Sequence, residues 1–142
     1  MNKYSVKFSP SHLKGCVTAP PSKSISHRAL ICAALADGVS IITNLAFSQD
    51  ILATLDALRA IGAEIGEIGA DTVKVTGIGG NVKPIEKLNC RESGSTLRFM
   101  IPICLLSPER SELTGSEKLL SCPLGIYSDM FKERYCGVKE AH

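Results

Sequence analysis

The order of predicted secondary-structure elements repeats along this chain, and this repeat constrains the fold more than any other feature. Each copy begins with hydroxyl residues and an Arg at a helix start. An apolar helix, a strand ending in Thr, a loop, a second helix and a Gly follow. A shared order at a fixed period indicates a duplicated unit. We therefore predict an α/β fold of β-α-β-α-β-β units, with the second copy incomplete at His142. The matched pairs lie about 70 residues apart and are Arg28 and Arg98, Thr43 and Thr114, and Gly62 and Gly137.

The boundaries of the elements follow from hydrophobic periodicity and from turn residues. Apolar positions from Ile51 to Ile61 have helical spacing, and Gly62 is placed to end that helix. The segment from Gly77 to Leu88 is rich in Gly and Pro and is predicted to be a loop. The predicted helices are 24–36, 48–61, 93–105 (with a bend near Pro102) and 124–134, and the predicted strands are 4–8, 15–19, 39–43, 63–65, 72–76 and 111–115.

A helix start rich in cations and hydroxyls follows a pair of prolines at residues 20 and 21. Lys23, Ser24 and Arg28 lie within the first two turns, and Ser24 and Arg28 share a helix face. Free backbone N–H groups and the helix dipole favour an anion at this end. Cations in the first turn are disfavoured by the same dipole, so their presence suggests that an anion binds from outside. The alternative is a capped helix start with a solvated charged face.

Composition narrows the range of functions. The net charge of +2 is too small for a nucleic-acid surface, and 5% aromatic residues with no Trp disfavour base stacking. The longest apolar run, 29–36, is far too short to span a membrane, and the first residues contain no signal-peptide core. We therefore expect a cytoplasmic protein that binds neither nucleic acid nor membrane. The six cysteines form no C-x-x-C pair, and we expect reduced, buried thiols.

The second copy has a helix start that is suited to the same kind of ligand. Gly94 permits close approach of a phosphate oxygen, and Ser95 donates hydrogen bonds, although a simple turn before a helix explains Gly94 equally well. Asp50 lies in the first helical turn, where the dipole favours an acid. We expect His27 on the helix surface, and the three histidines have no metal-ligand spacing. Two such helix starts, one from each copy, are predicted to converge on one anionic ligand.

Five segments together resemble the EPSP synthase family, the 3-phosphoshikimate 1-carboxyvinyltransferases. The resemblance runs from Gly15 onward, with the segments in the family's order, and the Ser-Lys-Ser-x-Ser-x-Arg pattern is specific. The segments are Pro-Ser-Lys-Ser-Ile-Ser-His-Arg-Ala-Leu at 21–30, Thr-Asn-Leu with Ser-Gln-Asp at 43–50, Glu-Ser-Gly-Ser-Thr-Leu-Arg at 92–98, Leu-Thr-Gly at 113–115 and Pro-Leu-Gly at 123–125.

The resemblance implies a fold and an activity. Family members have two domains of three β-α-β-α-β-β units each, and this chain would be about the first third of that enolpyruvyltransferase fold. Residues 1–17 would be opening strands of the first domain, and 18–142 part of the second. The family transfers the carboxyvinyl group of phosphoenolpyruvate to the 5-hydroxyl of shikimate 3-phosphate in the shikimate pathway to chorismate and aromatic amino acids. Full-length members are expected to be monomers that use no metal or organic cofactor.

The resemblance also assigns residues. Lys23 and Asp50 would be catalytic, with Lys23 also contacting phosphoenolpyruvate. Substrate binding would further involve Ser24 and Arg28 for shikimate 3-phosphate, together with Gly94, Ser95 and Arg98.

One residue departs from the family pattern, and two other functions stay open. Cys122 stands where the family has Arg before Pro, and a thiol supplies no positive fork. The 142-residue chain would also lack the acid–base groups of the opposite domain and is expected to be inactive alone. The alternatives are an enzyme like UDP-N-acetylglucosamine enolpyruvyltransferase, or a non-catalytic anion-binding module.

Overall fold

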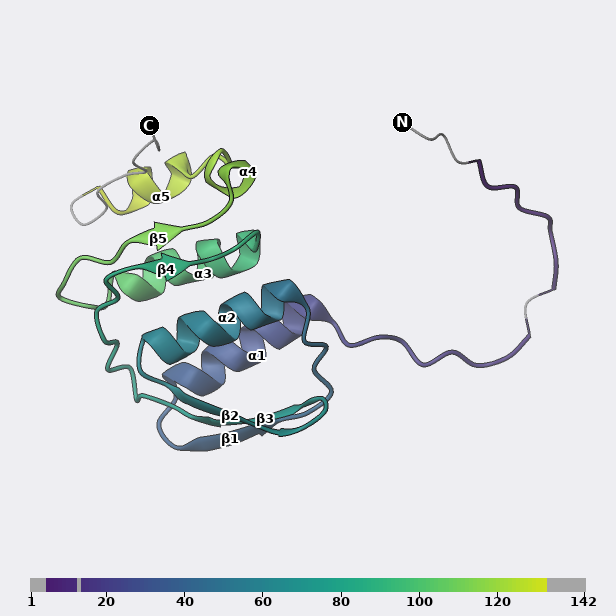
Figure 1. The fold of residues 1–142 in the computed structure, drawn as a ribbon, viewed down its shortest axis with the longest axis horizontal. Coiled ribbons are helices and arrows are strands. Elements are labelled where there is room, and N and C mark those ends of the chain that lie inside the picture. Colours follow the sequence, from purple (N-terminus) through teal and green to yellow (C-terminus); the bar gives the residue numbers. More distant parts are fainter. Residues whose placement is uncertain (1–4, 13, 133–142) are drawn as a thin grey trace.

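The computed structural model describes residues 5–12 and 14–132. Two groups of elements follow one another along the chain, as the repeat predicts (Figure 1). The first group contains α1 (Lys23–Leu35), β1 (Val39–Ile42), α2 (Gln49–Ala60), β2 (Glu64–Gly69) and β3 (Thr72–Thr76). The second contains β4 (Leu88–Asn89), α3 (Gly94–Cys104), β5 (Leu113–Thr114), α4 (Glu117–Leu120) and α5 (Gly125–Met130).

The first group forms a sheet covered by two helices. Its strands run in the order β1-β3-β2, and both neighbouring pairs are antiparallel. The sequence predicted the β2–β3 hairpin, although β2 is longer than expected. Helices α1 and α2 pack on one face of this sheet, and α3 packs against α2 on the side away from it (Figure 1).

The second group contains a short parallel pair of strands. Leu88 pairs with Leu113 and Asn89 with Thr114, and α3 connects the two strands. Strand β4 was not expected, because a segment of two residues carries no periodic signal and is defined only by its partner. Helix α4 was also not expected. The bend near Pro102 is untested, although Pro102 does lie inside α3.

The core lies between the sheet and the three long helices. The largest fully buried apolar side chains come from all three helices and from β3, which explains why the elements pack as one body. They are Leu30, Ile51, Leu55, Leu58, Ile61, Val73, Val75 and Met100.

A glycine-rich loop covers the carboxyl end of α1. The backbone N–H groups of Ile78, Gly79 and Gly80 donate to the carbonyls of residues 34, 36 and 35, at 2.9–3.0 Å. These carbonyls have no partner within a helix that stops at Leu35. The loop therefore anchors the helix whose other end carries Lys23 and Arg28.

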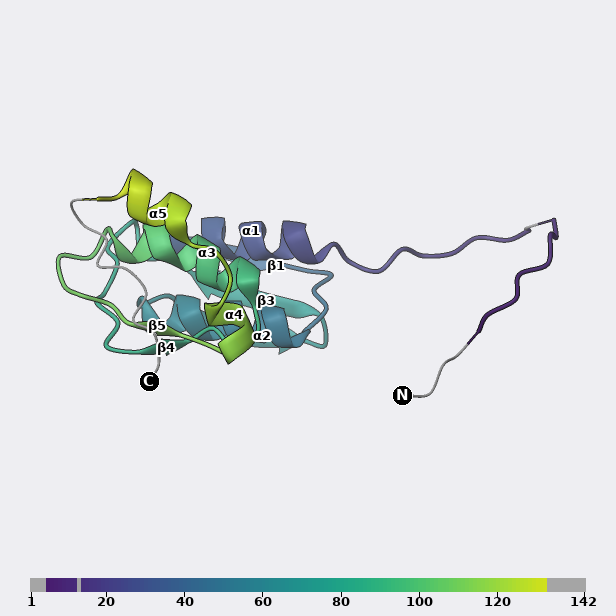
Figure 2. The ribbon, with the colours of Figure 1, turned by 90° about the horizontal axis from the view of Figure 1, so that it is seen from above.

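The two opening strands predicted at 4–8 and 15–19 are not observed among the residues that the structure describes. Residues 5–12 and 14–21 run away from the packed elements in both views (Figures 1 and 2). Val6, Phe8 and Val17 are 73%, 87% and 94% exposed. A strand needs a hydrogen-bonding partner, and no described residue supplies one to this segment.

Predictions about the cysteines, the last helix and the domain division are corrected by the structure, lie outside the described residues or stay predictions. Cys90 and Cys104 are buried, but Cys16 and Cys32 are exposed and Cys122 is half-buried; all five are free thiols. The last predicted helix is shorter, since α5 ends at Met130. Residues 131 and 132 follow without helix, and the rest of the predicted helix, its end at Gly137 and Cys136 fall on residues 133–142. The proposed division into residues 1–17 and 18–142 remains a prediction.

Candidate active site

Three helix N-termini lie together at one end of the fold. Helices α1, α2 and α3 all begin at the end where the opening segment enters (Figure 1). Each has a serine N-cap, namely Ser22, Ser48 and Ser93, whose side chain accepts a backbone N–H from the first turn. We call this region the helix-start site, and it comprises Lys23, Ser24, Arg28, Asp50, Gly94, Ser95 and Arg98.

Lys23 and Asp50 connect the starts of α1 and α2. Lys23 Nζ donates to Asp50 Oδ2 at 2.5 Å, and the two side chains are 55% and 27% exposed. Asp50 lies in the first turn of α2, where the helix dipole favours a carboxylate. The contact fixes the ammonium group at the mouth of the site, although an exposed pair stabilises the fold by only about 0–1 kcal/mol.

Arg28 connects α1 to α3. Its Nη1 donates to the carbonyl of Ser24 at 2.8 Å, one turn back on the same face. Its guanidinium carbon lies 5.3 Å from the centre of the Phe99 ring, within the range of a cation–π interaction. Arg28 remains exposed.

Gly94 and Arg98 form the start of α3. A Cβ built on Gly94 would lie 3.1 Å from Arg98 Nη1, so the guanidinium group rests against this glycine. Ser95 is half-buried and Arg98 is exposed. Cys122 follows α4, whose Leu119 lies 3.8 Å from the same Cβ position, and its Sγ donates to the carbonyl of Lys118 at 3.6 Å.

His27 does not lie on the helix surface as predicted, because it is 1% exposed. Its Nδ1 lies 2.8 Å from Thr54 Oγ1, and that hydroxyl lies 2.8 Å from Thr96 Oγ1. Burial lowers the pKa of His27 below 6.5, and the charges of Lys23 and Arg28 act in the same direction while Asp50 opposes them. The helical spacing in the sequence could have predicted this burial, because His27 shares one face of α1 with the apolar residues Leu30 and Ala34.

The hydrogen bonds continue from Thr96 to the N-cap of α3. Thr96 Oγ1 donates to Ser93 Oγ at 2.7 Å, and the Thr96 backbone N–H donates to the same oxygen at 3.1 Å. Thr96 Oγ1 also lies 3.4 Å from the carbonyl of Asp50. We call His27, Thr54, Thr96 and Ser93 the hydroxyl chain. It links α1, α2 and α3 directly beneath the helix-start site.

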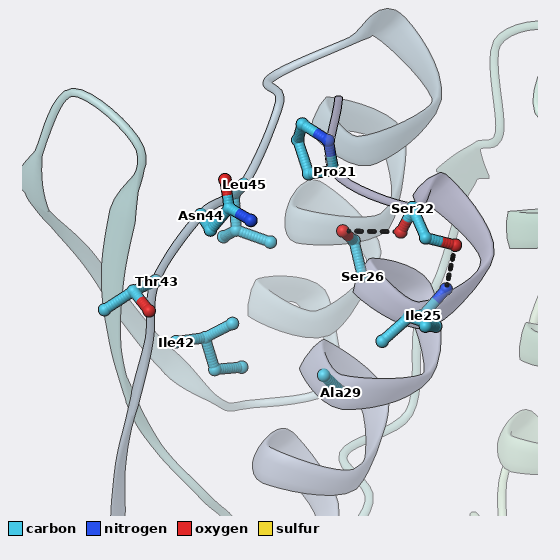
Figure 3. Close-up of a pocket in the computed structure, with 9 residues that line it drawn as sticks. All are labelled: Pro21, Ser22, Ile25, Ser26, Ala29, Ile42, Thr43, Asn44 and Leu45. Atoms are coloured by element: carbon cyan, nitrogen blue, oxygen red, sulfur yellow. Dashed lines mark hydrogen bonds between the residues drawn. The ribbon is translucent and has the colours of Figure 1, made fainter. Parts of the chain in front are cut away.

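A pocket of about 270 Å³ lies on another face of α1 (Figure 3). Ser22, Ile25, Ser26 and Ala29 line it on the helix, and residues 42–45 line it opposite. At 100° per residue, Ser24 and Arg28 point away from this face. Ser22 Oγ accepts from Ile25 N and Ser26 Oγ donates to the carbonyl of Ser22, so these polar groups are already bonded. Its lining carries no charge, and it is therefore separate from the candidate anion site.

The described residues contain neither a cluster of metal ligands nor a membrane-spanning helix. Between 5 and 132, apart from residue 13, no three His, Cys, Asp or Glu side chains are grouped as metal ligands. In the same part of the chain, no helix has the length and apolarity needed to cross a membrane.

Comparison with known proteins identifies the family. The sequence model of EPSP synthase, 3-phosphoshikimate 1-carboxyvinyltransferase, matches residues 8–139. A protein of that name from Clostridium kluyveri is 45% identical over 129 residues, which are 91% of this chain and 30% of that protein. One from Clostridium novyi is 42% identical over 143 residues, covering 95% of this chain and 32% of that protein.

A solved EPSP synthase from Acinetobacter baumannii has the same fold. It aligns with a TM-score of 0.74 and 30% identity, covering 81% of this chain and 26% of that structure. The prediction of repeated enolpyruvyltransferase units, amounting to about a third of the family fold, is confirmed. The chain spans about a third of the length of the curated relatives it matches. It belongs to the EPSP synthase family.

Proposed function

We propose that this chain is part of an enzyme that transfers the carboxyvinyl group of phosphoenolpyruvate to the 5-hydroxyl of shikimate 3-phosphate. One observation carries the proposal. The starts of α1 and α3, from the two repeat copies, bring Lys23, Arg28 and Arg98 to one end of the fold without an acid in the first turn of either helix. Both substrates are small polyanions, and cationic helix starts are suited to such ligands.

The geometry supports separate tasks for the residues of the helix-start site. Lys23, held by Asp50, offers a point charge to phosphoenolpyruvate, whose phosphate would lie against Gly94 and Ser95 at the start of α3. Arg28 offers a two-pronged match to an anionic group of shikimate 3-phosphate, with Ser24 beside it. Arg98 adds positive charge against Gly94. Asp50 acts by keeping the Lys23 ammonium group in place. Under this proposal the reaction takes place without metal or organic cofactor.

A second function, anion binding without catalysis, is favoured by one residue. The Cys122 thiol donates a hydrogen bond to a backbone carbonyl, and Cys122 supplies no cation where the family pattern has Arg. Loss of one Arg–phosphate contact costs about 2–5 kcal/mol of binding free energy. Loss of a general acid or base costs a further factor of about 10²–10⁴ in rate. We expect the 142-residue chain by itself to release no phosphate above the blank when both substrates are present.

Titration by nuclear magnetic resonance tests the proposal. The wild-type chain should bind shikimate 3-phosphate weakly, near a millimolar dissociation constant or about −4 kcal/mol, with shifts of the amides from Ser22 to Ala29. Arg28→Ala should weaken this binding more than Lys23→Ala, because the guanidinium group makes the two-pronged contact. Lys74→Ala, which removes an exposed lysine from β3, is the control for non-specific charge. Shifts confined to other parts of a folded chain, or equal losses in all three variants, would contradict the proposal.

A further inference from the structure

The hydroxyl chain links helices far apart in sequence, at positions adjacent to the residues that face the ligand. His27 precedes Arg28 on α1, and Thr96 follows Ser95 on α3. Thr54 joins them from the middle of α2. Thr96 also approaches the carbonyl of Asp50, the partner of Lys23. A displacement anywhere along the hydroxyl chain would therefore change the distance between the two ligand-facing helix starts.

The unpartnered nitrogen of His27 indicates the direction of the hydrogen bonds. Nε2 is buried and has no hydrogen-bond partner among the described residues. A buried N–H without an acceptor is rarer than an unused acceptor, so the ring proton belongs on Nδ1. Nδ1–H then donates to Thr54, Thr54 donates to Thr96, and Thr96 donates to Ser93. Each of these three hydrogen bonds uses one proton, and the last one ends on Ser93, the N-cap of α3.

The same arrangement disfavours a charge on His27. Protonation would place a second N–H at Nε2, where no described residue accepts it. The new charge would also lie close to the cations Lys23 and Arg28 of its own helix, with only Asp50 of α2 in its favour. The hydroxyl chain is therefore neutral beneath a positively charged site, and it contributes fixed distances rather than charge.

We infer that His27, Thr54 and Thr96 are positioning residues, which hold the starts of α1 and α3 at the separation that phosphoenolpyruvate requires. The inference rests on the proposed function, in which this ligand contacts Lys23 on α1 and Gly94 on α3. Shikimate 3-phosphate contacts only α1 within this chain. Loosening the hydroxyl chain should therefore weaken binding of the ligand that spans both helices more than binding of the ligand held by one.

Three threonine variants test this inference in the 142-residue chain. Thr54→Val keeps the side-chain shape and removes the central hydroxyl, whereas Thr54→Ser keeps the hydroxyl. Thr114→Val is the matched control, because within the described part of the chain the Thr114 hydroxyl donates only to the carbonyl of Leu88, at 3.1 Å, and joins β4 to β5. Affinities for phosphoenolpyruvate and shikimate 3-phosphate are measured by amide titration, and stability by urea unfolding of the same samples.

We expect Thr54→Val to weaken phosphoenolpyruvate binding about 3- to 10-fold, the effect of one hydrogen bond, with a smaller change for shikimate 3-phosphate. Thr54→Ser should restore wild-type affinity, and Thr114→Val should leave both affinities unchanged. Equal weakening for the two ligands, or a loss of stability with unchanged affinities, would overturn the inference, because either result describes a purely structural hydroxyl.

If the wild-type chain binds neither ligand, that result counts against the proposed function alone. Nitrogen-15 spectra then still test whether the hydroxyl chain positions the helix starts. The His27 ring should show a proton on Nδ1. Thr54→Val should shift the amides of both 23–28 and 94–98, and Thr114→Val should not shift them. A ring proton on Nε2, or an unshifted helix start in Thr54→Val, would reject the hydroxyl chain as a positioning device.

Discussion

Gly77 supports the carboxyl end of α1 at a point where no side chain fits. A Cβ at this position would lie 2.1 Å from the carbonyl oxygen of Ala36 and 2.5 Å from that of Ala33. Both are backbone atoms of α1 and of the residue that ends it, so neither can rotate away. Gly77→Ala must therefore push the loop from the helix end.

The expected loss of stability follows from the hydrogen bonds that the loop makes. Moving the loop weakens the three bonds from residues 78–80 to the carbonyls of residues 34–36. At about 0.5–1.5 kcal/mol each, their loss lowers the free energy of unfolding by about 2–4 kcal/mol. Gly80 differs, because it has φ +80° but nothing within 4 Å of a Cβ, so Gly80→Ala should cost about 1–2 kcal/mol of backbone strain. Gly66 has neither constraint, and Gly66→Ala should change stability by less than about 1 kcal/mol.

Urea unfolding followed by far-ultraviolet circular dichroism measures all three variants. The predicted order of destabilisation is Gly77→Ala, then Gly80→Ala, then Gly66→Ala, at a common denaturant slope. If Gly77→Ala is as stable as Gly66→Ala, the close approach of loop and helix end is wrong. If Gly80→Ala is the most damaging, backbone strain outweighs the steric contact and the reasoning fails.

Three further predictions concern titration, thiols and the departure from the family pattern. Because burial lowers the pKa of His27, the wild-type chain should lose stability as the pH falls below 6.5, by at most about 1.4 kcal/mol per pH unit. His27→Asn should lack this loss. If urea unfolding shows the same dependence of stability on pH for both proteins, the prediction is wrong. Burial raises the pKa of Cys90 to about 12 and also raises that of Cys104, so iodoacetamide should modify Cys16 and Cys32 in the folded chain and spare these two. After unfolding without reductant, mass measurement should show six alkyl groups, and a deficit of two would indicate a disulfide. In a chain extended to the family's full length, Cys122→Arg should tighten phosphoenolpyruvate binding far more than shikimate 3-phosphate binding, and equal gains would show that Cys122 is wrongly placed.

Local sequence signals predicted the elements that carry the site. Ser22, Ser48 and Ser93 are N-caps, and the helices that follow begin within a residue of their predicted starts. Capping depends on residues close in sequence, so a single sequence reveals it. The pairing of Lys23 with Asp50 was not predicted, although both residues were assigned to the site. Their functional roles remain predictions, because the similar proteins identify the family without testing individual residues.

Strands that depend on hydrogen bonds to a distant segment could not be predicted from the sequence in the same way. The alternating residues near the amino terminus have the pattern of a strand, but pattern alone supplies no hydrogen bonds, and the described part of this segment has none to the packed elements. Strand β4 shows the reverse case, because Leu88 and Asn89 have no pattern and become a strand only beside Leu113 and Thr114.

The hydroxyl chain consists of residues on predicted helices, but its hydrogen bonds depend on partners from other helices. Sequence analysis therefore finds the charged residues of the candidate site but not the residues proposed to set the distance between them. His27, Thr54 and Thr96 each look like an isolated polar position on a helix, for which solvent exposure is the ordinary expectation. They become one connected group only after the three helices pack, and packing is directed by apolar neighbours such as Leu30, Leu55 and Met100. Among the described residues, His27 Nδ1 and the hydroxyls of Thr54 and Thr96 then satisfy one another, and Thr96 also contacts Ser93 and the carbonyl of Asp50. The charges proposed to bind an anion are thus evident in the sequence, whereas the residues proposed to set the distance between them become connected only in the folded chain.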